Sequence, residues 1–252
     1  MRTEWKVVSA TLLISLTLAG CQAEQPPQIE ASAPEPGSDR VAWVTQERIA
    51  AADSEPGNWL THGRTWTEQR FSPLDQINDQ NVDELGLAWF VDLDTNRGQQ
   101  STPIVVDGVM YSTSAWSKVQ AVDVRTGDVK WQFDPAIHKS WDAKTCCGVQ
   151  NRGAAVWEGR VFVGTIDGRL IALDADSGEM EWEVQTTDAS DNYSITGAPR
   201  VANGLVIIGN GGAEYGVRGY VTAYHADDGE QAWRFWVVPG NPADGFENDA
   251  ME

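Results

Sequence analysis

The sequence predicts an all-β protein, a β-propeller of four-stranded blades, because one pattern recurs along it at a fixed period. Three copies follow A-x-D-x-x-T-G-x-x-x-W with small variations, and their tryptophans and glycines are each spaced 51 residues apart. A period near 50 that holds several short strands is typical of propeller blades. Helical periodicity is nearly absent, with only a short helix expected at 44–52 and a turn near 82–85.

Apolar stretches broken by tight turns define the strands of the first blade. We expect these strands at 103–106, 109–114, 118–123 and 129–133, with turns at Asp107-Gly108 and Thr126-Gly127. The second and third blades have the same layout, and the third carries an insertion at 213–219 in its middle hairpin. One domain, 41–252, is therefore expected to hold three blades near 99–133, 153–184 and 198–236, and a strand at 87–91 that belongs to a closing blade.

The repeated tryptophans Trp131, Trp182 and Trp233 are predicted to fasten each blade to its neighbour. A flat indole on an outer strand packs well against the next sheet, and its N–H group can reach a backbone acceptor there. The glycine of each copy supplies the positive φ of a tight turn.

The N-terminus, residues 1–21, reads as an export signal. Residues 7–20 form an apolar run of 14 residues, which is too short to span a membrane. The run ends in Leu18-Ala19-Gly20-Cys21, which resembles the bacterial lipobox and implies that Cys21 is lipidated. The alternative is an ordinary secretory signal with a stray cysteine. Residues 22–40 are rich in Pro, Glu, Ala and Ser, and are expected to form a flexible tether.

These features predict a periplasmic protein held by a lipid anchor to the outer membrane, since Gln22 replaces the Asp that favours inner-membrane retention. Its 18 basic and 37 acidic residues give a net charge of −19. Such a surface argues against nucleic acid or anionic lipid as partners and suits a cationic partner or a metal ion. The three histidines have no ligand-like spacing, and no C-x-x-C-H haem motif occurs in the sequence.

Cys146 and Cys147 are adjacent, and two interpretations are open. Neighbouring Cα atoms lie about 3.8 Å apart, below the roughly 4.4–6.8 Å that is usual for disulfides, so a bond between them would close a small, strained ring. Such strain persists mainly where function requires it. The alternative is a pair of buried, reduced thiols that act as small apolar residues. In an oxidising compartment, with Cys21 lipidated, the disulfide is the favoured interpretation.

Several segments outside the repeat form a specific combination. They are 59–63 (WLTHG), 70–74 (RFSPL), 77–82 (INDQNV), 146–153 (CCGVQNRG), 196–199 (TGAP) and 209–220 (GNGGAEYGVRGY). Together, from about residue 58 to the end of the chain, they resemble the pyrroloquinoline quinone (PQQ)-dependent alcohol dehydrogenases of the methanol/ethanol group. The tryptophan pattern likewise resembles the docking repeat of PQQ propellers, which in this family number eight blades.

The resemblance implies a binding site for PQQ, a flat orthoquinone with three carboxylates. The Cys146–Cys147 disulfide would lie against one face of the ring. Arg152 offers a planar fork that matches a carboxylate, the alternative being a surface ion pair. Thr196 offers a hydroxyl, the alternative being a turn residue. The implied cofactor-binding set is Gln100, Cys146, Cys147, Arg152, Thr196, Gly211, Gly212 and Ala213.

Glu214 matches the family's metal-ligating Glu, so the resemblance implies a calcium or lanthanide ion there. A carboxylate suits a hard cation, and the ion would polarise the quinone carbonyl as a Lewis acid. Taken alone, Glu214 reads as solvated surface. A dinucleotide-binding loop is excluded here, because Glu214 stands where the third glycine of G-x-G-x-x-G belongs and no helix is predicted to follow.

The chain departs from the family at two positions. Gln100 replaces a Glu that contacts PQQ, and Gly211 stands where several members have Ser. The family's catalytic Asp base, an Asn metal ligand and the Trp under the quinone lie on later blades, so no catalytic residue is assigned in this chain. We therefore expect these 252 residues to be the N-terminal part of a longer protein and to be inactive when isolated. Turnover of an alcohol by the isolated chain with PQQ and calcium would contradict this.

The function implied is oxidation of a primary alcohol to an aldehyde. A base would take the alcohol proton while hydride passes to PQQ, and a periplasmic acceptor such as a cytochrome c would receive the electrons. The alternative is a non-enzymatic, PQQ-like propeller lipoprotein that acts as a scaffold for outer-membrane protein assembly. A third interpretation, a degenerate dehydrogenase kept as a binding protein, draws some support from Gln100.

Overall fold

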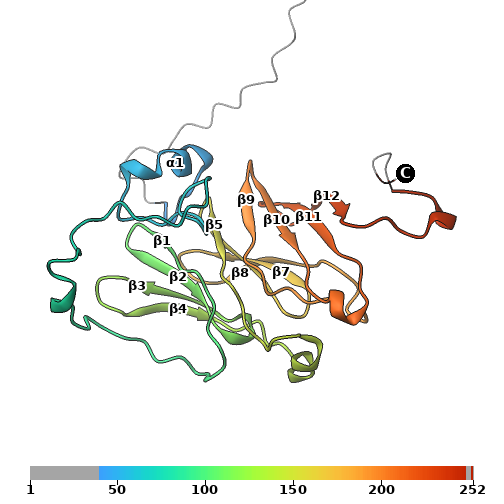
Figure 1. Ribbon diagram of the computed structural model, residues 1–252, viewed down its shortest axis with the longest axis horizontal. Helices are drawn as coiled ribbons and strands as arrows, with labels where there is room; N and C mark the ends of the chain where they lie inside the picture. Colours follow the sequence, from blue (N-terminus) through green and yellow to red (C-terminus); the bar gives the residue numbers. More distant parts are fainter. Residues whose placement is uncertain (1–39, 248–250, 252) are drawn as a thin grey trace, which may run out of the picture. The chain divides into compact units, whose positions relative to one another are not determined.

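The computed structural model describes residues 40–247 and 251 of the chain. Three antiparallel four-stranded sheets lie side by side in chain order, each with its strands in sequence order from one edge to the other (Figure 1). Blade 1 contains β1 (Ile104–Val106), β2 (Val109–Thr113), β3 (Val119–Asp123) and β4 (Val129–Phe133); blade 2 contains β5 (Ala155–Trp157), β6 (Arg160–Gly164), β7 (Arg169–Asp174) and β8 (Met180–Gln185); blade 3 contains β9 (Arg200–Ala202), β10 (Leu205–Gly209), β11 (Tyr220–His225) and β12 (Gln231–Trp236).

The all-β propeller prediction is confirmed for the described residues, and the strands fall within a residue of the three predicted blade ranges. In the part of the chain that the structure describes, helical structure is limited to short pieces. They are α1 (Gln46–Ala50) and the 3-10 turns η1 (Ala52–Ser54), η2 (Val82–Glu84), η3 (Ala115–Ser117), η4 (Lys139–Lys144), η5 (Ala213–Tyr215) and η6 (Pro242–Asp244). The helix expected at 44–52 and the turn near 82–85 correspond to α1 with η1 and to η2.

The first hairpin of each blade closes with a two-residue turn in which both residues have positive φ. This geometry matches the right-handed twist of the strands and favours Asp-Gly and Asn-Gly pairs. The turns are Asp107-Gly108 (φ 51° and 82°), Glu158-Gly159 (44° and 82°) and Asn203-Gly204 (51° and 70°).

The repeated Ala and Trp lie opposite each other on the last two strands of each blade. Ala121 pairs with Trp131, Ala172 with Trp182 and Ala223 with Trp233, and the register shifts at the residue after each alanine. A small residue opposite the indole leaves the ring free to reach the neighbouring blade. The repeat therefore encodes a bulged strand pair and not only a turn.

Trp131 and Trp182 fasten blade 1 to blade 2 and blade 2 to blade 3, as predicted. The indole Nε1 of Trp131 donates to the Ala175 carbonyl at 3.0 Å, and that of Trp182 donates to the Ala226 carbonyl at 3.1 Å. Each ring also covers the glycine of the next blade's repeat, because a Cβ on Gly178 would lie 2.6 Å from the Trp131 ring. Trp233 is 41% exposed, and no described residue accepts a hydrogen bond from its indole.

The predicted strand at 87–91 is wrong, because the described chain offers this segment no strand to pair with. Trp89 nevertheless docks on blade 1 in the same way as the repeated tryptophans. Its Nε1 donates to the Val124 carbonyl at 2.8 Å, and a Cβ on Gly127 would lie 2.8 Å from its ring. Besides Trp131 and Trp182, the segment thus carries a third docked tryptophan among the described residues, one that lacks the upstream repeat.

The segment that precedes blade 1 links the turns of blades 1 and 2. Arg48, on α1, binds both Glu55 and Asp107, while the backbone carbonyl of Val44 accepts a hydrogen bond from Glu158 N at 3.0 Å. Figure 1 shows α1 beside β1 and β5. Further along, Trp59 forms an antiparallel bridge with Val105 of β1. This bridge places the residues that come after Trp59 along the innermost strands of the blades, which are β1, β5 and β9.

The main hydrophobic core joins all three blades to this N-terminal segment. Its fully buried side chains include Leu60, Tyr111, Phe162 and Val206. The export signal, Cys21 and the tether up to residue 39 lie outside the described residues. Within residues 40–247 and 251, no helix is long and apolar enough to cross a membrane.

We expect Gly178→Ala to destabilise the protein more than Gly204→Ala. Both glycines have left-handed backbones, with φ of 74° and 70°, so each substitution costs roughly 1–2 kcal/mol for the backbone. Only the Cβ at 178 would overlap the Trp131 ring, whereas nothing lies within 4 Å of a Cβ at 204. Overpacking should add about 1–3 kcal/mol at 178. Urea unfolding of the purified variants measures the difference, and equal losses would show that the docked indole does not constrain the glycine.

Candidate cofactor site

The three blades meet where the chain leads into their innermost strands, β1, β5 and β9. Thr102 N donates to the Arg152 carbonyl at 3.1 Å, and Arg152 N donates to the Thr196 carbonyl at 2.9 Å. Thr102 also forms a parallel bridge with Gly153. Residues far apart in the sequence are thereby held side by side, and the main chain of Arg152 is bonded to both neighbouring blades.

Gly153 is required for this close approach. Its φ is 132°, and a Cβ at this position would lie 2.9 Å from the Thr102 carbonyl oxygen. A side chain would push blade 1 away from blade 2 at the point where Arg152 is held.

Arg152 presents its guanidinium at the surface of this junction. The residue is exposed, and one Nη donates to the Thr196 hydroxyl. No carboxylate among the described residues pairs with it, so the alternative of a surface ion pair receives no support from the residues that the structure describes. The remaining N–H groups of the fork are available to a ligand, and a planar guanidinium fits a carboxylate with two parallel hydrogen bonds.

Cys146 and Cys147 lie on an exposed turn with their Sγ atoms 2.6 Å apart. Both are free cysteines in the structure, in contrast with the disulfide expected from the sequence, which therefore stays a prediction. They are exposed, so the interpretation of a buried pair of thiols is wrong. The neighbouring Cys147 thiol and then the Glu214 carboxylate raise the pKa of the Cys146 thiol to about 11. Glu214 therefore lies beside the cysteine pair, although 68 residues separate Glu214 from Cys146 in the sequence.

The loop that carries Glu214 is shaped by two glycines. Gly211 exchanges two backbone hydrogen bonds with Ser194, at 2.6 and 3.3 Å. Gly212 has a φ of 108°, and a Cβ there would lie 2.5 Å from the Asn192 carbonyl oxygen. Ala213 and Glu214 follow on η5 and are exposed. The insertion predicted at 213–219 is thus a short surface loop between β10 and β11.

The predicted residues are brought together to different degrees. Arg152 contacts Thr196, and Cys146 lies beside Glu214, as described above. Gln100 is exposed, and its side chain forms no hydrogen bond with another predicted residue in the described part of the chain. Across residues 40–247 and 251, no three His, Cys, Asp or Glu side chains form a metal-ligand group, so the role of Glu214 as a ligand stays a prediction.

Sequence reasoning missed two residues at this junction. Arg70 donates to the Thr102 hydroxyl at 3.2 Å, which adds a second cation near the chain crossing. Asn151 is buried directly beside Arg152, with 1% of its surface exposed. The available signal was its place in 146–153, as a polar residue two positions before the glycine that the close approach requires.

His62 lies in the segment that runs along the innermost strands, and its Nδ1 is buried without a hydrogen-bond partner among the described residues. Burial, followed by the positive charges of Arg200 and Arg70, lowers the pKa of His62 below its ordinary value, and Glu68 opposes this in part. Glu68 itself is paired with Arg200 at 2.9 Å.

Residues 59–251 match the family described as PQQ, glucose/ethanol/alcohol dehydrogenase, beta-propeller domain. The chain therefore belongs to the PQQ-dependent alcohol dehydrogenase family. It is 55% identical over 223 residues to the quinohemoprotein alcohol dehydrogenase ADH-IIG of Pseudomonas putida, a match that covers 88% of this chain and 31% of that protein. It is 50% identical to the quinohemoprotein alcohol dehydrogenase of Comamonas testosteroni over 84% of this chain and 30% of that protein.

Solved structures agree with this assignment. The Pseudomonas putida ADHIIG structure superposes with a TM-score of 0.82 at 56% identity, over 83% of this chain and 31% of that one. A europium-containing methanol dehydrogenase superposes with a TM-score of 0.74 at 35% identity, over 81% of this chain and 36% of that one. The chain thus spans about a third of the length of the curated relatives it matches.

We expect His62 to make stability depend on pH. Because its pKa is lowered in the folded state, the unfolded chain binds more protons as the pH falls through about 6.5. The contribution of His62 is complete above that pH and is lost as the pH falls through the folded-state pKa. Urea unfolding from pH 8 to pH 5 should show a steeper loss for the wild type than for His62→Gln. Parallel curves would contradict the buried position of the ring.

Proposed function

We propose that this chain forms part of the PQQ pocket of an enzyme that oxidises a primary alcohol to an aldehyde. The observation that carries the proposal is Arg152: its backbone is hydrogen-bonded to both neighbouring blades, and its guanidinium is open apart from its bond to the Thr196 hydroxyl. The support from relatives is that proteins 50–55% identical to the chain are named as quinohemoprotein alcohol dehydrogenases. Because the chain spans a third of them, the whole enzyme's activity is a proposal.

The residues present fit a flat tricarboxylate. Arg152 offers charge and two parallel donors, and the Thr196 hydroxyl lies beside it. Gly211 and Gly212 shape the loop that leads to the exposed Ala213, which adds only a methyl group. Cys146 and Cys147 provide an exposed sulfur surface. When bound, PQQ supplies the orthoquinone that accepts hydride from the alcohol.

We further propose that Glu214 contributes to a calcium or lanthanide site next to the cofactor. Its carboxylate is exposed and lies beside Cys146, and oxygen ligands of this type suit hard cations. The solved relative described as europium-containing supports a lanthanide as one of the two choices. No further metal ligand and no catalytic base is assigned among the described residues.

The compartment and the electron acceptor are also proposals. An export signal at 1–21 with Cys21 as a lipid attachment site would place the protein in the periplasm, anchored to the outer membrane. Oxidation there would join Cys146 to Cys147. A relative from Thauera butanivorans that is 53% identical is named 1-butanol dehydrogenase (cytochrome c), which supports a cytochrome c as the electron acceptor.

The alternative of a non-enzymatic scaffold lacks a specific observation in its favour. A scaffold has no need of an arginine fork kept free of carboxylates, nor of a loop that places Glu214 beside a cysteine pair. Binding of PQQ by the purified protein separates the two hypotheses, because a scaffold would not bind it.

Arg152→Met should weaken PQQ binding by the complete protein about 10- to 100-fold in the presence of calcium. This corresponds to the loss of a charge-assisted hydrogen bond worth about 1.5–3 kcal/mol. Arg160→Met is a matched control, since Arg160 pairs with Glu181 of blade 2 and Asp227 of blade 3 and forms no hydrogen bond with Arg152 or Thr196. Equilibrium dialysis of PQQ measures both variants. Equal affinities for Arg152→Met and the wild type would contradict the proposed role of the fork.

A further inference from the structure

Asn151 is a buried polar residue whose side chain uses its full hydrogen-bonding capacity. Its Oδ1 accepts from the Thr113 hydroxyl at 2.8 Å and from Gly153 N at 3.0 Å. Its Nδ2 donates to the Gly164 carbonyl at 2.8 Å and to Ser117 Oγ at 3.2 Å. An amide has two donor hydrogens and two acceptor lone pairs, so only an amide side chain, Asn or the longer Gln, offers this set.

The partners of Asn151 come from two blades. Thr113 ends β2, and Ser117 lies in the turn between β2 and β3, both in blade 1. Gly164 ends β6 in blade 2. The side chain therefore ties the two blades together one residue before Arg152, whose backbone is bonded to Thr102 and Thr196. Residues 151–153 are fixed from all sides, while the Arg152 guanidinium faces outward.

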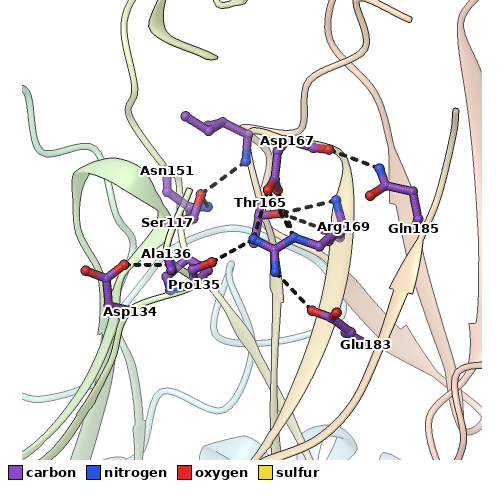
Figure 2. A network of polar contacts seen from close by, with 11 residues as sticks. Ser117, Asp134, Pro135, Ala136, Asn151, Thr165, Asp167, Arg169, Glu183 and Gln185 are labelled. Carbon is purple, nitrogen blue, oxygen red and sulfur yellow. Dashed lines mark hydrogen bonds and ion pairs between the residues drawn. The ribbon is translucent and has the colours of Figure 1, made fainter. Parts of the chain in front are cut away.

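Ser117 has an unusual position in this network. It is fully buried, and its backbone lies in the left-handed region with φ of 56°, as does that of Trp116 with φ of 67°. Such a conformation is unfavourable for residues other than glycine and persists where the surroundings enforce it. The strained turn places Ser117 Oγ where it accepts from both Asn151 Nδ2 and Ile166 N, the latter at 3.3 Å (Figure 2).

The same turn also anchors the segment that carries the cysteine pair. Trp116 N donates to the Val149 carbonyl at 2.8 Å. Val149 packs in a second, smaller hydrophobic cluster with Ala115, Ile137 and Ile166, which Trp116 and Trp141 border. The turn at 116–117 thus contacts the chain on both sides of Gln150, between the cysteines and Arg152.

We propose that Asn151 and Ser117 are positioning residues that fix the Arg152 guanidinium for the carboxylate of its ligand. The inference rests on the proposed function, because it needs Arg152 to bind PQQ. Neither residue touches that ligand under this proposal. Their effect is to hold residues 151–153 against both neighbouring blades, so that the fork is presented in one orientation before the cofactor arrives.

Ser117→Gly and Ser117→Ala test the proposal through PQQ affinity. Both remove the hydroxyl, but glycine relieves the left-handed backbone whereas alanine retains its cost. We expect both variants to bind PQQ roughly three- to tenfold more weakly than the wild type, the effect of one lost hydrogen bond. If stability alone mattered, the glycine variant would bind better than the alanine variant, and that result would overturn the proposal.

A double-mutant cycle separates positioning from a general structural effect. In an Arg152→Met background, Ser117→Gly should leave PQQ affinity unchanged, since the group it positions is gone. Equal losses in both backgrounds would overturn the proposal. Thr186→Val is the matched control: Thr186 is equally buried and donates to the Gly168 carbonyl at 2.7 Å, away from Arg152. It should not alter PQQ affinity in either background.

Amide hydrogen exchange provides a readout that needs no cofactor. Ser117→Gly should speed exchange at the amides of Thr102, Arg152 and Gly153, and Thr186→Val should not. Unchanged protection at these amides would overturn the positioning role even if PQQ binds. Absence of PQQ binding by the wild type would instead reject the proposed function, and the exchange data would still decide whether the network holds residues 151–153. Asn151→Asp, which lacks both amide donors, should show the same exchange pattern more strongly.

Discussion

The site depends on two backbone hydrogen bonds, from Thr102 N to the Arg152 carbonyl and from Arg152 N to the Thr196 carbonyl. They join the starts of the innermost strands of three successive blades. One bond uses the N–H group of Arg152 and the other uses its carbonyl group. The backbone from which the Arg152 side chain extends is therefore held at a defined place in the propeller. The glycine at 153 permits this approach, and Asn151 braces it from the buried side. Without these contacts the predicted cofactor residues would belong to three independent sheets.

The outer parts of the blades maintain the same spacing by another means. Each docked indole donates to a carbonyl of the next blade and covers a glycine that cannot accept a side chain, as Trp131 does with Ala175 and Gly178. Blades are thus fixed at both their inner and outer strands. A pocket built from short loops can then have a defined geometry, because the blades that carry the loops are held at a fixed spacing.

Much of the fold was predictable because each blade satisfies its hydrogen bonds locally, through hairpins whose turn residues are visible in the sequence. Docking by Trp89 was not predictable, because no copy of the repeat pattern precedes this tryptophan. The strand predicted at 87–91 did not form because a β-strand needs a partner strand, and an apolar run such as this one does not supply a partner. At the site, the motifs indicated Arg152 and Glu214, but only the folded chain shows that Asn151 is buried and that Glu214 lies beside Cys146.

The central claim is that the junction of three blades presents Arg152 to a carboxylate of PQQ. A crystal structure of the complete protein with PQQ and calcium tests it most directly. The account predicts a PQQ carboxylate in hydrogen-bond contact with the Arg152 guanidinium, next to the Thr196 hydroxyl, with the ring against a joined Cys146–Cys147 pair. PQQ bound elsewhere, with Arg152 facing solvent or paired with a protein carboxylate, would contradict it.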